Sequence, residues 1–261
     1  MPPEIRKVVK RSRQARAPAI AALVVLPLLA LIVRAFADVW RAPAMVPQRL
    51  GLRGVRIAFS GDTATAFTNS LIVALLTVTV ALIVGWPAAR VLGERRLRHP
   101  APVFLLLALP LLVPSYAVGS GLTEWFIRLG LDGTTLALVA AHLTFVLPYV
   151  VIVLLAGFGP RLTAIEEMGS VSGLTPLRRL AWVTLPSAAP TIAAAALLGF
   201  LVSWSDYGSS LAVGAGRPML PVVLLPFVGA DPQVAATLAL LFLAPAIAAL
   251  AVTVRAGRQP L

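Results

Sequence analysis

The sequence predicts an all-helical membrane protein with six membrane-spanning helices. Of its 261 residues, 59% are hydrophobic and only 12% are charged, whereas about 25% of the residues in a soluble domain are charged. Apolar stretches long enough to cross the hydrocarbon core of a bilayer as helices recur along the chain. The predicted spans are 18–37, 66–92, 101–123, 134–158, 187–213 and 233–255.

The basic residues indicate on which side of the membrane each loop lies. Most of the 22 lysines and arginines fall in the N-terminal tail, after the second span, in the loop after the fourth span, and at the C-terminal end. The positive-inside rule therefore predicts that both termini and the loop after the fourth span are cytoplasmic. We interpret the net charge of +12 as this topology signal, assisted by anionic lipid, and expect no binding of nucleic acid.

Proline interrupts most of the predicted spans. Pro110 and Pro114 lie in the third span and are followed by Gly119-Ser120-Gly121. We expect a weakened helix there that lines a cavity, because irregular backbone is tolerated in a membrane where it faces protein or water. The other spans carry Pro27, Pro87, Pro148 and Pro245.

The first apolar stretch lacks a small-residue cleavage site, so we expect it to be retained as a span. The absence of cysteine excludes disulfides and thiolate sites, and two histidines argue against a metal site. No catalytic residues are expected. The hydroxyl residues show no nucleophile-elbow pattern, and the adjacent Glu166 and Glu167 point to different sides of a helix.

A polar stretch at 159–186, the 159–186 loop, separates the fourth and fifth spans. Thr163 and Glu166 have the spacing of a capping box, which predicts a helix that begins at Thr163. Glu167 would then lie in the first turn, where the helix dipole favours negative charge. One face of this helix would be formed by Ile165, Met168, Val171 and Ser172.

The second half of the 159–186 loop predicts another short helix. Gly173 suits the left-handed residue that ends the first helix, and Thr175-Pro176 suits the start of the next. Leu177, Leu180 and Ala181 would form its apolar face, and Pro186 would end it. The loop is therefore predicted to be a helix–turn–helix at the membrane surface, either contacting a partner or lying there without one.

Three features of this loop stand at the spacing of the cytoplasmic "EAA" motif of permease subunits from binding-protein-dependent ABC importers: a glutamate, a glycine and a terminal Leu-Pro pair. Met168 and Gly169 replace the two alanines of the motif, and Val183 replaces an isoleucine. The chain also resembles this family at 69–71, 86–90, 141–149 and 200–207, and its second half is most similar to the spermidine/putrescine-type subunits. The motif residues are Glu167, Gly173, Leu185 and Pro186.

The resemblance implies the type I importer permease (MetI-like) fold in a multi-pass protein of the bacterial cytoplasmic (inner) membrane. A basic cytoplasmic tail at 1–17 would precede a transmembrane permease domain at 18–261, with its core at about 66–255. The 159–186 loop would be the coupling helix, seated in a cleft of the ATPase subunit. The implied coupling residues are Glu166, Glu167, Gly169, Gly173, Leu185 and Pro186.

The resemblance also implies the partners. These are two ATPase subunits, a second permease subunit, identical or different, and an extracytoplasmic solute-binding protein. The chain has no G-x-x-x-x-G-K-[ST] phosphate loop, and its only lysines, Lys7 and Lys10, lie in the N-terminal tail. We therefore expect no enzyme activity and no cofactor in this chain, with ATP and Mg bound by the ATPase subunit.

Asp206 is the only acid well inside a predicted span. An intramembrane carboxylate costs about 2.5–3.5 kcal/mol on insertion scales, so it should face the helix bundle or a wet cavity. Trp204 and Tyr207 flank it and could hold a cation by cation–π contact. The alternative is a structural hydrogen bond from Asp206 to His142 or a serine. Further candidates for the substrate pathway, near the outer end of the third span, are Glu124, Trp125 and Tyr116.

These residues favour a polyamine or related organic cation as the transported solute. The family branch leaves thiamine, ferric iron and phosphonate as alternatives. Two other classes remain open from the residues: an ATPase-independent secondary carrier and a membrane enzyme acting on lipid or polyprenyl substrates. The role of the basic external segment 41–64 is left open.

Overall fold

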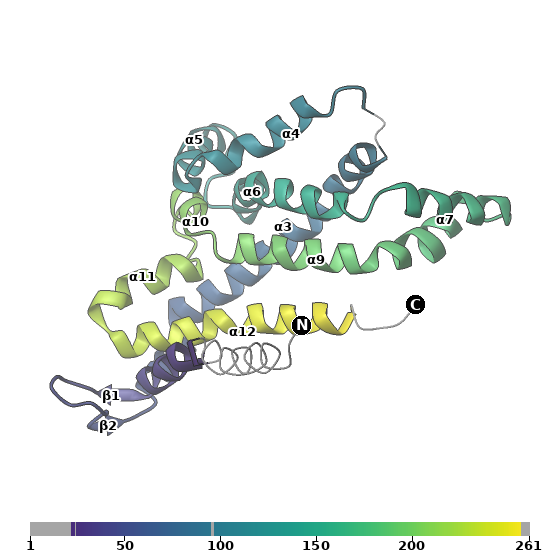
Figure 1. The fold of residues 1–261 in the computed structure, drawn as a ribbon. Coiled ribbons are helices and arrows are strands. Elements are labelled where there is room, and N and C mark those ends of the chain that lie inside the picture. Colours follow the sequence, from purple (N-terminus) through teal and green to yellow (C-terminus); the bar gives the residue numbers. More distant parts are fainter. Residues whose placement is uncertain (1–21, 24, 95–96, 257–261) are drawn as a thin grey trace, which may run out of the picture. The chain divides into compact units, whose positions relative to one another are not determined.

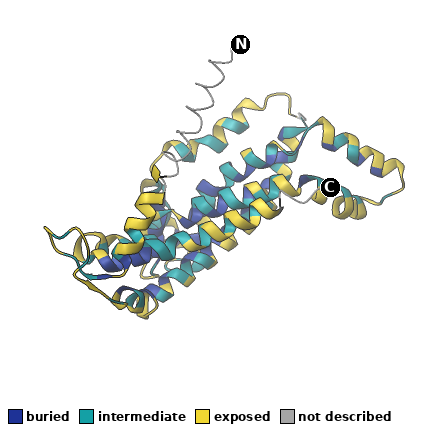
Figure 2. Ribbon diagram, turned by 60° about the horizontal axis from the view of Figure 1, so that its bottom comes forward, coloured by how far each residue is buried: buried dark blue, intermediate teal, exposed yellow. Residues whose placement is uncertain are grey.

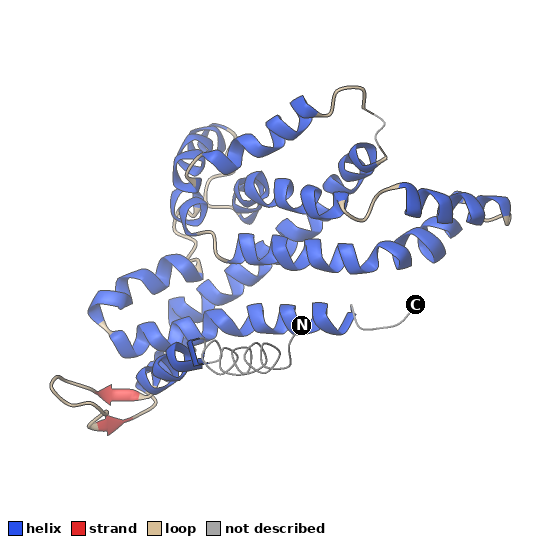
Figure 3. Cartoon of the chain, in the orientation of Figure 1, coloured by secondary structure: helices blue, strands red, loops and turns tan. Residues whose placement is uncertain are grey.

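The computed structural model of the chain describes residues 22–23, 25–94 and 97–256, which are mostly helical (Figures 1 and 3). They divide into two compact units. The first unit contains the described residues up to Gly61 together with Leu224–Leu243, and the second contains Asp62–Val223 and the described residues from Ala244 onward. The predicted basic tail at 1–17 lies outside the described residues.

Four helical stretches of the described chain are long and apolar enough to cross a membrane. The third of them is continuous through α8 (Pro176–Arg179), a π-helical turn (Leu180–Thr184) and α9 (Leu185–Trp204). The prediction that Pro186 ends this helix is therefore wrong, because the helix continues into α9 through the π-helical turn that precedes the proline. The other three stretches are α3 (Gly61–Gly93), α6 (Thr135–Leu155) and α12 (Pro232–Ala256).

The number of possible spans rises to five if one bent pair of helices, in the predicted third span, is counted as a single crossing. Residues Ala101–Leu112 and Ser115–Arg128 meet at an angle of 97°. The bend lies at Val113, whose backbone is extended, and at Pro114, which begins the next segment. This confirms the predicted weakness at the prolines of the third span. The elements are α4 (Ala101–Ala108), a 3₁₀ turn (Leu109–Leu112) and α5 (Ser115–Arg128).

The first predicted span, 18–37, is described only in part. A helix at Val25–Ala35 is apolar but shorter than a span, and residues 18–21 and 24 are outside the described part of the chain. Two helices were not predicted from the sequence: α2 (Arg53–Ala58) and α11 (Leu220–Ala230). The predicted fifth span, 187–213, is interrupted, because α9 ends at Trp204 and α10 (Tyr207–Val213) begins after Asp206.

Helix α6 supplies much of the core of the second unit. Its Val146 and Val150 are fully buried, and they face Gly199 of α9. A Cβ added at Gly199 would lie only 2.9 Å from the Val150 side chain, so glycine is what allows the two helices to approach closely. The long helices nevertheless keep exposed faces (Figure 2), and on α3 these include Ile72, Leu75 and Ile83. Helices that are apolar on all sides are typical of membrane spans.

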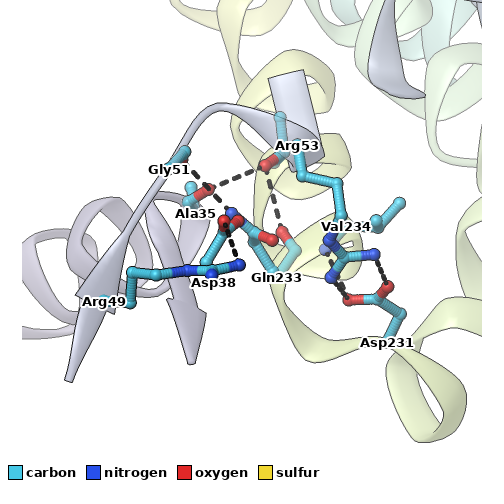
Figure 4. A network of polar contacts seen from close by, with 9 residues as sticks. Ala35, Asp38, Arg49, Gly51, Arg53, Asp231, Gln233 and Val234 are labelled. Atoms are coloured by element: carbon cyan, nitrogen blue, oxygen red, sulfur yellow. Dashed lines mark hydrogen bonds and ion pairs between the residues drawn. The ribbon is translucent and has the colours of Figure 1, made fainter. Parts of the chain in front are cut away.

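The first unit contains a polar network around a short hairpin of β1 (Ala37–Val39) and β2 (Arg49–Leu50) (Figure 4). Arg53 donates two hydrogen bonds to Asp231, at 2.5 and 3.0 Å. Gln233 Nε2 donates to the carbonyl of Gly51 at 3.3 Å, and Thr237 Oγ1 donates to the carbonyl of Ala35 at 3.3 Å. Within this unit these hydrogen bonds join the β1–β2 hairpin and the residues beside it to the start of α12.

The ion pair between Arg53 and Asp231 makes the stability of this region depend on pH. The hydrogen bonds from Arg53 lower the pKa of the Asp231 carboxyl, and partial burial opposes that shift. A carboxyl with a lowered folded-state pKa stabilises the fold above its unfolded pKa of about 3.9. This stabilisation is lost as the pH falls through the folded-state pKa.

We therefore predict that Arg53→Met lowers the melting temperature at pH 7 by about 2–4 °C, the shift expected for about 1 kcal/mol. The difference from the wild type should shrink as the pH falls below about 4. Thermal unfolding in detergent across pH measures both effects. Arg56→Met, at an exposed arginine of α2, is the control; an equal loss there, or a difference independent of pH, would contradict the assignment.

Candidate functional site

The 159–186 loop folds into the predicted helical hairpin, which extends past the ends of α6 and α9 (Figure 1). Its first helix is α7 (Pro160–Val171), and Gly173 ends it in the left-handed conformation, with φ at 80°. Thr175 precedes Pro176 at the start of α8, as predicted. Gly169 lies where the two arms meet, since a Cβ there would contact Leu174 and Val183 at 3.4 Å.

The predicted capping box is wrong. Helix α7 begins at Pro160, three residues before Thr163, because proline has the right φ for the first helical position and needs no donor there. Thr163 consequently lies inside the helix and donates to the carbonyl of Gly159 at 3.3 Å. This releases the carboxylate of Glu166 for another contact.

Glu166 is buried, at 6% exposure, and both of its carboxylate oxygens accept hydrogen bonds. One accepts from Arg90 near the end of α3, and the other from the hydroxyl of Thr184. Arg90 also donates from Nε to Glu94 at 2.7 Å. A buried carboxylate is costly unless it is paired and hydrogen-bonded, and here each oxygen has a donor.

Arg90 and Thr184 were not predicted as site residues. The available signals were an arginine at the end of an apolar stretch and a hydroxyl inside Val183-Thr184-Leu185-Pro186. Neither indicates that the two side chains share one carboxylate, because the partners are 76 and 18 residues away from Glu166 along the chain.

Glu167, about 100° further round the helix than Glu166, is exposed. It lines a surface pocket of about 470 Å³ together with Glu94, Gly93 and Pro160. Glu94 is already paired with Arg90, so the exposed carboxylate of this pocket is that of Glu167. The pocket therefore presents negative charge to the solvent beside the hairpin.

The predicted apolar faces of the hairpin point outward. Of these predicted faces, Val171 is 91% and Leu177 79% exposed, and Met168 is also exposed. Trp182, which was not predicted, is 77% exposed. The inward face of α7 is formed by Leu162, Glu166 and Gly169 instead. Exposed large apolar side chains gathered on one short hairpin are typical of an interaction surface. Leu185 and Pro186 are exposed and lie at the start of α9.

Asp206 lies at the break between α9 and α10. Its Oδ1 accepts from the backbone N–H of Ser209 at 3.2 Å and so caps α10. Among the described residues, its buried Oδ2 has no hydrogen-bond partner. Asp206 lines a pocket of about 310 Å³, the Asp206 pocket, together with Leu111, Val113, Ser115, Phe145, Tyr149, Val202 and Ser205.

The aromatic residues expected beside Asp206 lie elsewhere. Trp204 is 1% exposed and stacks on Phe200, with ring centroids 5.7 Å apart. Tyr207 is partly exposed, and neither residue lines the Asp206 pocket. The tyrosine in that pocket is Tyr149 of α6, which was not predicted.

The outer candidates on α5 are not part of the Asp206 pocket. Glu124 accepts two hydrogen bonds from Arg128, at 3.0 and 2.8 Å. The same guanidinium lies 5.8 Å from the centre of the Trp125 ring. Tyr116 is exposed, and its carbonyl accepts from Ser120. Arg128 therefore binds the carboxylate of Glu124 and lies over the ring of Trp125, the acid and the aromatic residue that were predicted to contact a substrate.

His142 is buried and hydrogen-bonded through both of its ring nitrogens. Its Nδ1 lies 2.9 Å from the hydroxyl of Ser203, and its Nε2 lies 3.1 Å from that of Ser210. Ser210 donates its own hydrogen to the carbonyl of Asp206 at 2.6 Å. The Nε2–H tautomer satisfies all three groups, because Nε2 then donates to Ser210 and Nδ1 accepts from Ser203. These bonds hold α9 and α10 on α6 at the helix break.

No protein family model matches the chain, but individual relatives do. It is 33% identical over 197 residues to ORF1 of Streptomyces antibioticus, named as an ABC transporter permease protein, covering 71% of the chain and 82% of the relative. It is 29% identical to the trehalose transport permease SugB of Mycobacterium tuberculosis, covering 72% and 69%. It is 32% identical to the spermidine/putrescine transport permease PotC of Haemophilus influenzae, covering 67% and 70%.

Two solved structures have a similar fold over nearly the whole chain. A bacterial ABC transporter that imports the acidic polysaccharide alginate matches with a TM-score of 0.57 at 17% identity, covering 97% of both chains. The alginate transporter in complex with its alginate-pentasaccharide-bound periplasmic protein matches with a TM-score of 0.60 at 17% identity, covering 96% and 94%.

The hairpin turn gives a direct test of the local geometry. A Cβ at Gly173 would meet nothing within 4 Å, so the only penalty for a side chain there is its left-handed backbone. We predict that Gly173→Val destabilises the chain by about 1–2 kcal/mol. Gly173→Asn should cost less, because asparagine tolerates this conformation.

Gly159→Ala is the matched control for this measurement. Gly159 is equally uncrowded, but its φ of 179° is an extended conformation that alanine adopts without strain. Thermal unfolding in detergent should rank the variants Gly159→Ala, Gly173→Asn and Gly173→Val from most to least stable. Equal stability of Gly173→Val and Gly159→Ala would contradict the turn geometry.

Proposed function

The chain belongs to the ABC importer permease family of multi-pass membrane proteins. We propose that its 159–186 loop binds a separate ATPase subunit and transmits the conformational change that ATP hydrolysis drives there. The observation that carries this proposal is the outward apolar face of the hairpin, on which Val171 is 91% and Trp182 77% exposed. Apolar side chains exposed to water contribute no burial energy to the fold, whereas a partner that covers them removes their apolar area from water and gains that free energy.

The proposed topology follows from the charge distribution. Six spans would place both termini and the 159–186 loop in the cytoplasm of a bacterium, with the chain in its inner membrane. The first span would include the helix Val25–Ala35, and the bent α4–α5 pair would be one crossing. This arrangement corresponds to a type I (MetI-like) permease with its transmembrane domain at 18–261 and its core at about 66–255.

The proposed docking surface combines apolar and acidic elements. Trp182 and Val171 would supply apolar contacts, one from each arm, and aromatic side chains carry much of the energy of most interfaces. Glu167 lines a pocket beside it, and its exposed carboxylate would accept a basic side chain of the ATPase subunit. Gly173 would keep the tip of the hairpin narrow, and Leu185-Pro186 would carry the movement into α9.

The energy source follows from the same chemistry. The sequence contains no phosphate loop of the G-x-x-x-x-G-K-[ST] type, so a dimer of ATPase subunits would bind the ATP and Mg. A second permease subunit would complete the pathway, and an extracytoplasmic solute-binding protein would deliver the solute. Because its relatives are transporter permeases, the family does not support a membrane enzyme.

Docking can be tested by cysteine labelling, because the chain contains no cysteine. We predict that Val171→Cys reacts quickly with a maleimide in the isolated permease and slowly once the ATPase subunits are bound. Met45→Cys is the control, since Met45 is 93% exposed and lies on the opposite, external side in the proposed topology. Unchanged labelling at residue 171 in an assembled, ATP-hydrolysing complex would refute the docking surface.

For the transported solute, we propose a polyamine or a related organic cation. The support is the Asp206 pocket, in which one carboxylate oxygen lacks a partner and the rings of Phe145 and Tyr149 are close by. An ammonium group suits a free carboxylate oxygen and an aromatic face. No basic residue of the described chain lines this pocket, which disfavours the anionic phosphonate. Ferric iron would need more ligands than one carboxylate. Thiamine is a cation and remains an alternative.

We predict that Asp206→Asn raises the KM for spermidine uptake by about tenfold, the loss expected for one charge-assisted hydrogen bond. Asparagine still caps α10, so the helix break is preserved. Glu124→Gln is the control, because its carboxylate already binds Arg128. Uptake kinetics in proteoliposomes decide the question: an unchanged KM in Asp206→Asn, or an equal effect in Glu124→Gln, would count against the pathway role.

A further inference from the structure

Glu166 and Glu167 are neighbours in the 159–186 loop, but their carboxylates serve different surfaces. Glu167 is exposed at the proposed docking surface, whereas Glu166 is buried against the membrane helices. We propose that Arg90 is a positioning residue that fastens the 159–186 loop to the cytoplasmic end of α3, so that loop and helix move together. This inference rests on the proposed function of the loop.

The fastening is a polar clamp of four side chains, Arg90, Glu94, Glu166 and Thr184. A single guanidinium reaches two carboxylates, with Nε on Glu94 and Nη2 on Glu166. The planar fork of arginine donates in two directions at once, which the single ammonium of lysine does not reproduce. Thr184 then ties the same Glu166 carboxylate to the π-helical turn before α9. One carboxylate therefore connects α7, α3 and the entry to α9.

An apolar contact joins α3 to the start of the loop at a second point. The rings of Trp86 and Phe158 meet edge to face, with centroids 4.8 Å apart. A Cβ on Gly93 would lie 2.5 Å from the Cβ of Phe158 and 2.8 Å from its carbonyl oxygen, so the backbones are in direct contact there. Phe158 itself is 6% exposed. Two separate attachments prevent the hairpin from pivoting on α3 as it would on a single one.

The clamp and the aromatic contact connect the 159–186 loop to α3, a helix to which it is not joined directly along the chain. The loop continues covalently into α6 and α9, which move with it by necessity. Helix α3 ends 67 residues before α7 begins at Pro160 and is joined to it only through side chains and packing. If the clamp is broken, a displacement of the loop by the ATPase subunit still moves α6 and α9 but is not transmitted fully to α3. ATP hydrolysis would then continue with less solute moved.

The test uses the complete transporter, with ATPase subunits and binding protein, in proteoliposomes. For each variant the solute moved per ATP hydrolysed is measured beside the melting temperature of the complex. Arg90→Gln and Glu166→Gln should each lower this ratio by about tenfold while ATP hydrolysis persists. The double variant should lose no more than either single variant, because the two side chains act as a pair.

Arg90→Lys should recover only part of the ratio, since lysine holds one carboxylate at a time. Arg161→Gln, an exposed arginine on α7 itself, is the matched control and should keep the wild-type ratio. A merely structural role would lower the melting temperature and the amount of assembled complex but leave the ratio of the assembled fraction unchanged. That result for Arg90→Gln would overturn the proposal.

Thr184→Val keeps the shape of its side chain and removes only the donor to Glu166, so it carries the test if Arg90→Gln does not assemble. It should lower the ratio by about threefold, and a wild-type ratio would overturn the clamp. Failure of the proposed function has a different signature, since the wild-type chain would then show no ATP-driven uptake with its ATPase subunits. Coupled wild-type transport with an unaffected Arg90→Gln would refute the clamp alone.

Discussion

The buried carboxylate of Glu166 fixes the position of the 159–186 loop relative to the membrane helices of its unit. Its two oxygens accept hydrogen bonds from Arg90 of α3 and from Thr184, in the π-helical turn just before α9. Removing either donor would leave a buried charge under-satisfied, which is costly in a low-dielectric setting. The inward orientation of this one side chain turns the opposite side of α7 outward. The exposed Val171 and Glu167 follow from it.

A second constraint governs the membrane part of the same unit. The break between α9 and α10 would leave backbone groups unpaired at membrane depth. The Asp206 carboxylate caps the new helix, and His142 holds two serines on either side of the break. Asp206 is also the one acid among the described residues that line its pocket. A structural cap and a solute contact are therefore compatible roles for one carboxylate.

Local sequence signals predicted the parts of the fold that depend on neighbouring residues. Apolar stretches located the long helices, Gly173 located the turn of the hairpin, and Pro114 marked the bend in the third span. The failures have physical causes. The helix start at Thr163 was misplaced because Pro160 is a stronger start signal than the capping spacing. The interruption at Asp206 was missed because a single polar residue in an apolar stretch does not reveal a cap.

The contacts of the candidate sites were less predictable than their residues. Glu166 and Asp206 were identified from the sequence, but Arg90 and Tyr149 were not, because each meets its partner through tertiary packing over long sequence separations. Trp204, chosen as a neighbour of Asp206 in sequence, packs instead with Phe200 in the core. Adjacency along a helix does not place two side chains on one face.

The most direct measurement is an electron cryomicroscopy structure of the assembled transporter in nucleotide-free and ATP-bound states. The account predicts that the α7 face around Val171 is buried against the ATPase subunit in both states, with the Arg90 guanidinium within hydrogen-bond distance of Glu166. The loop and the end of α3 should shift as one body between the states. An ATPase contact made by another segment, with the 159–186 loop left in solvent, would contradict it.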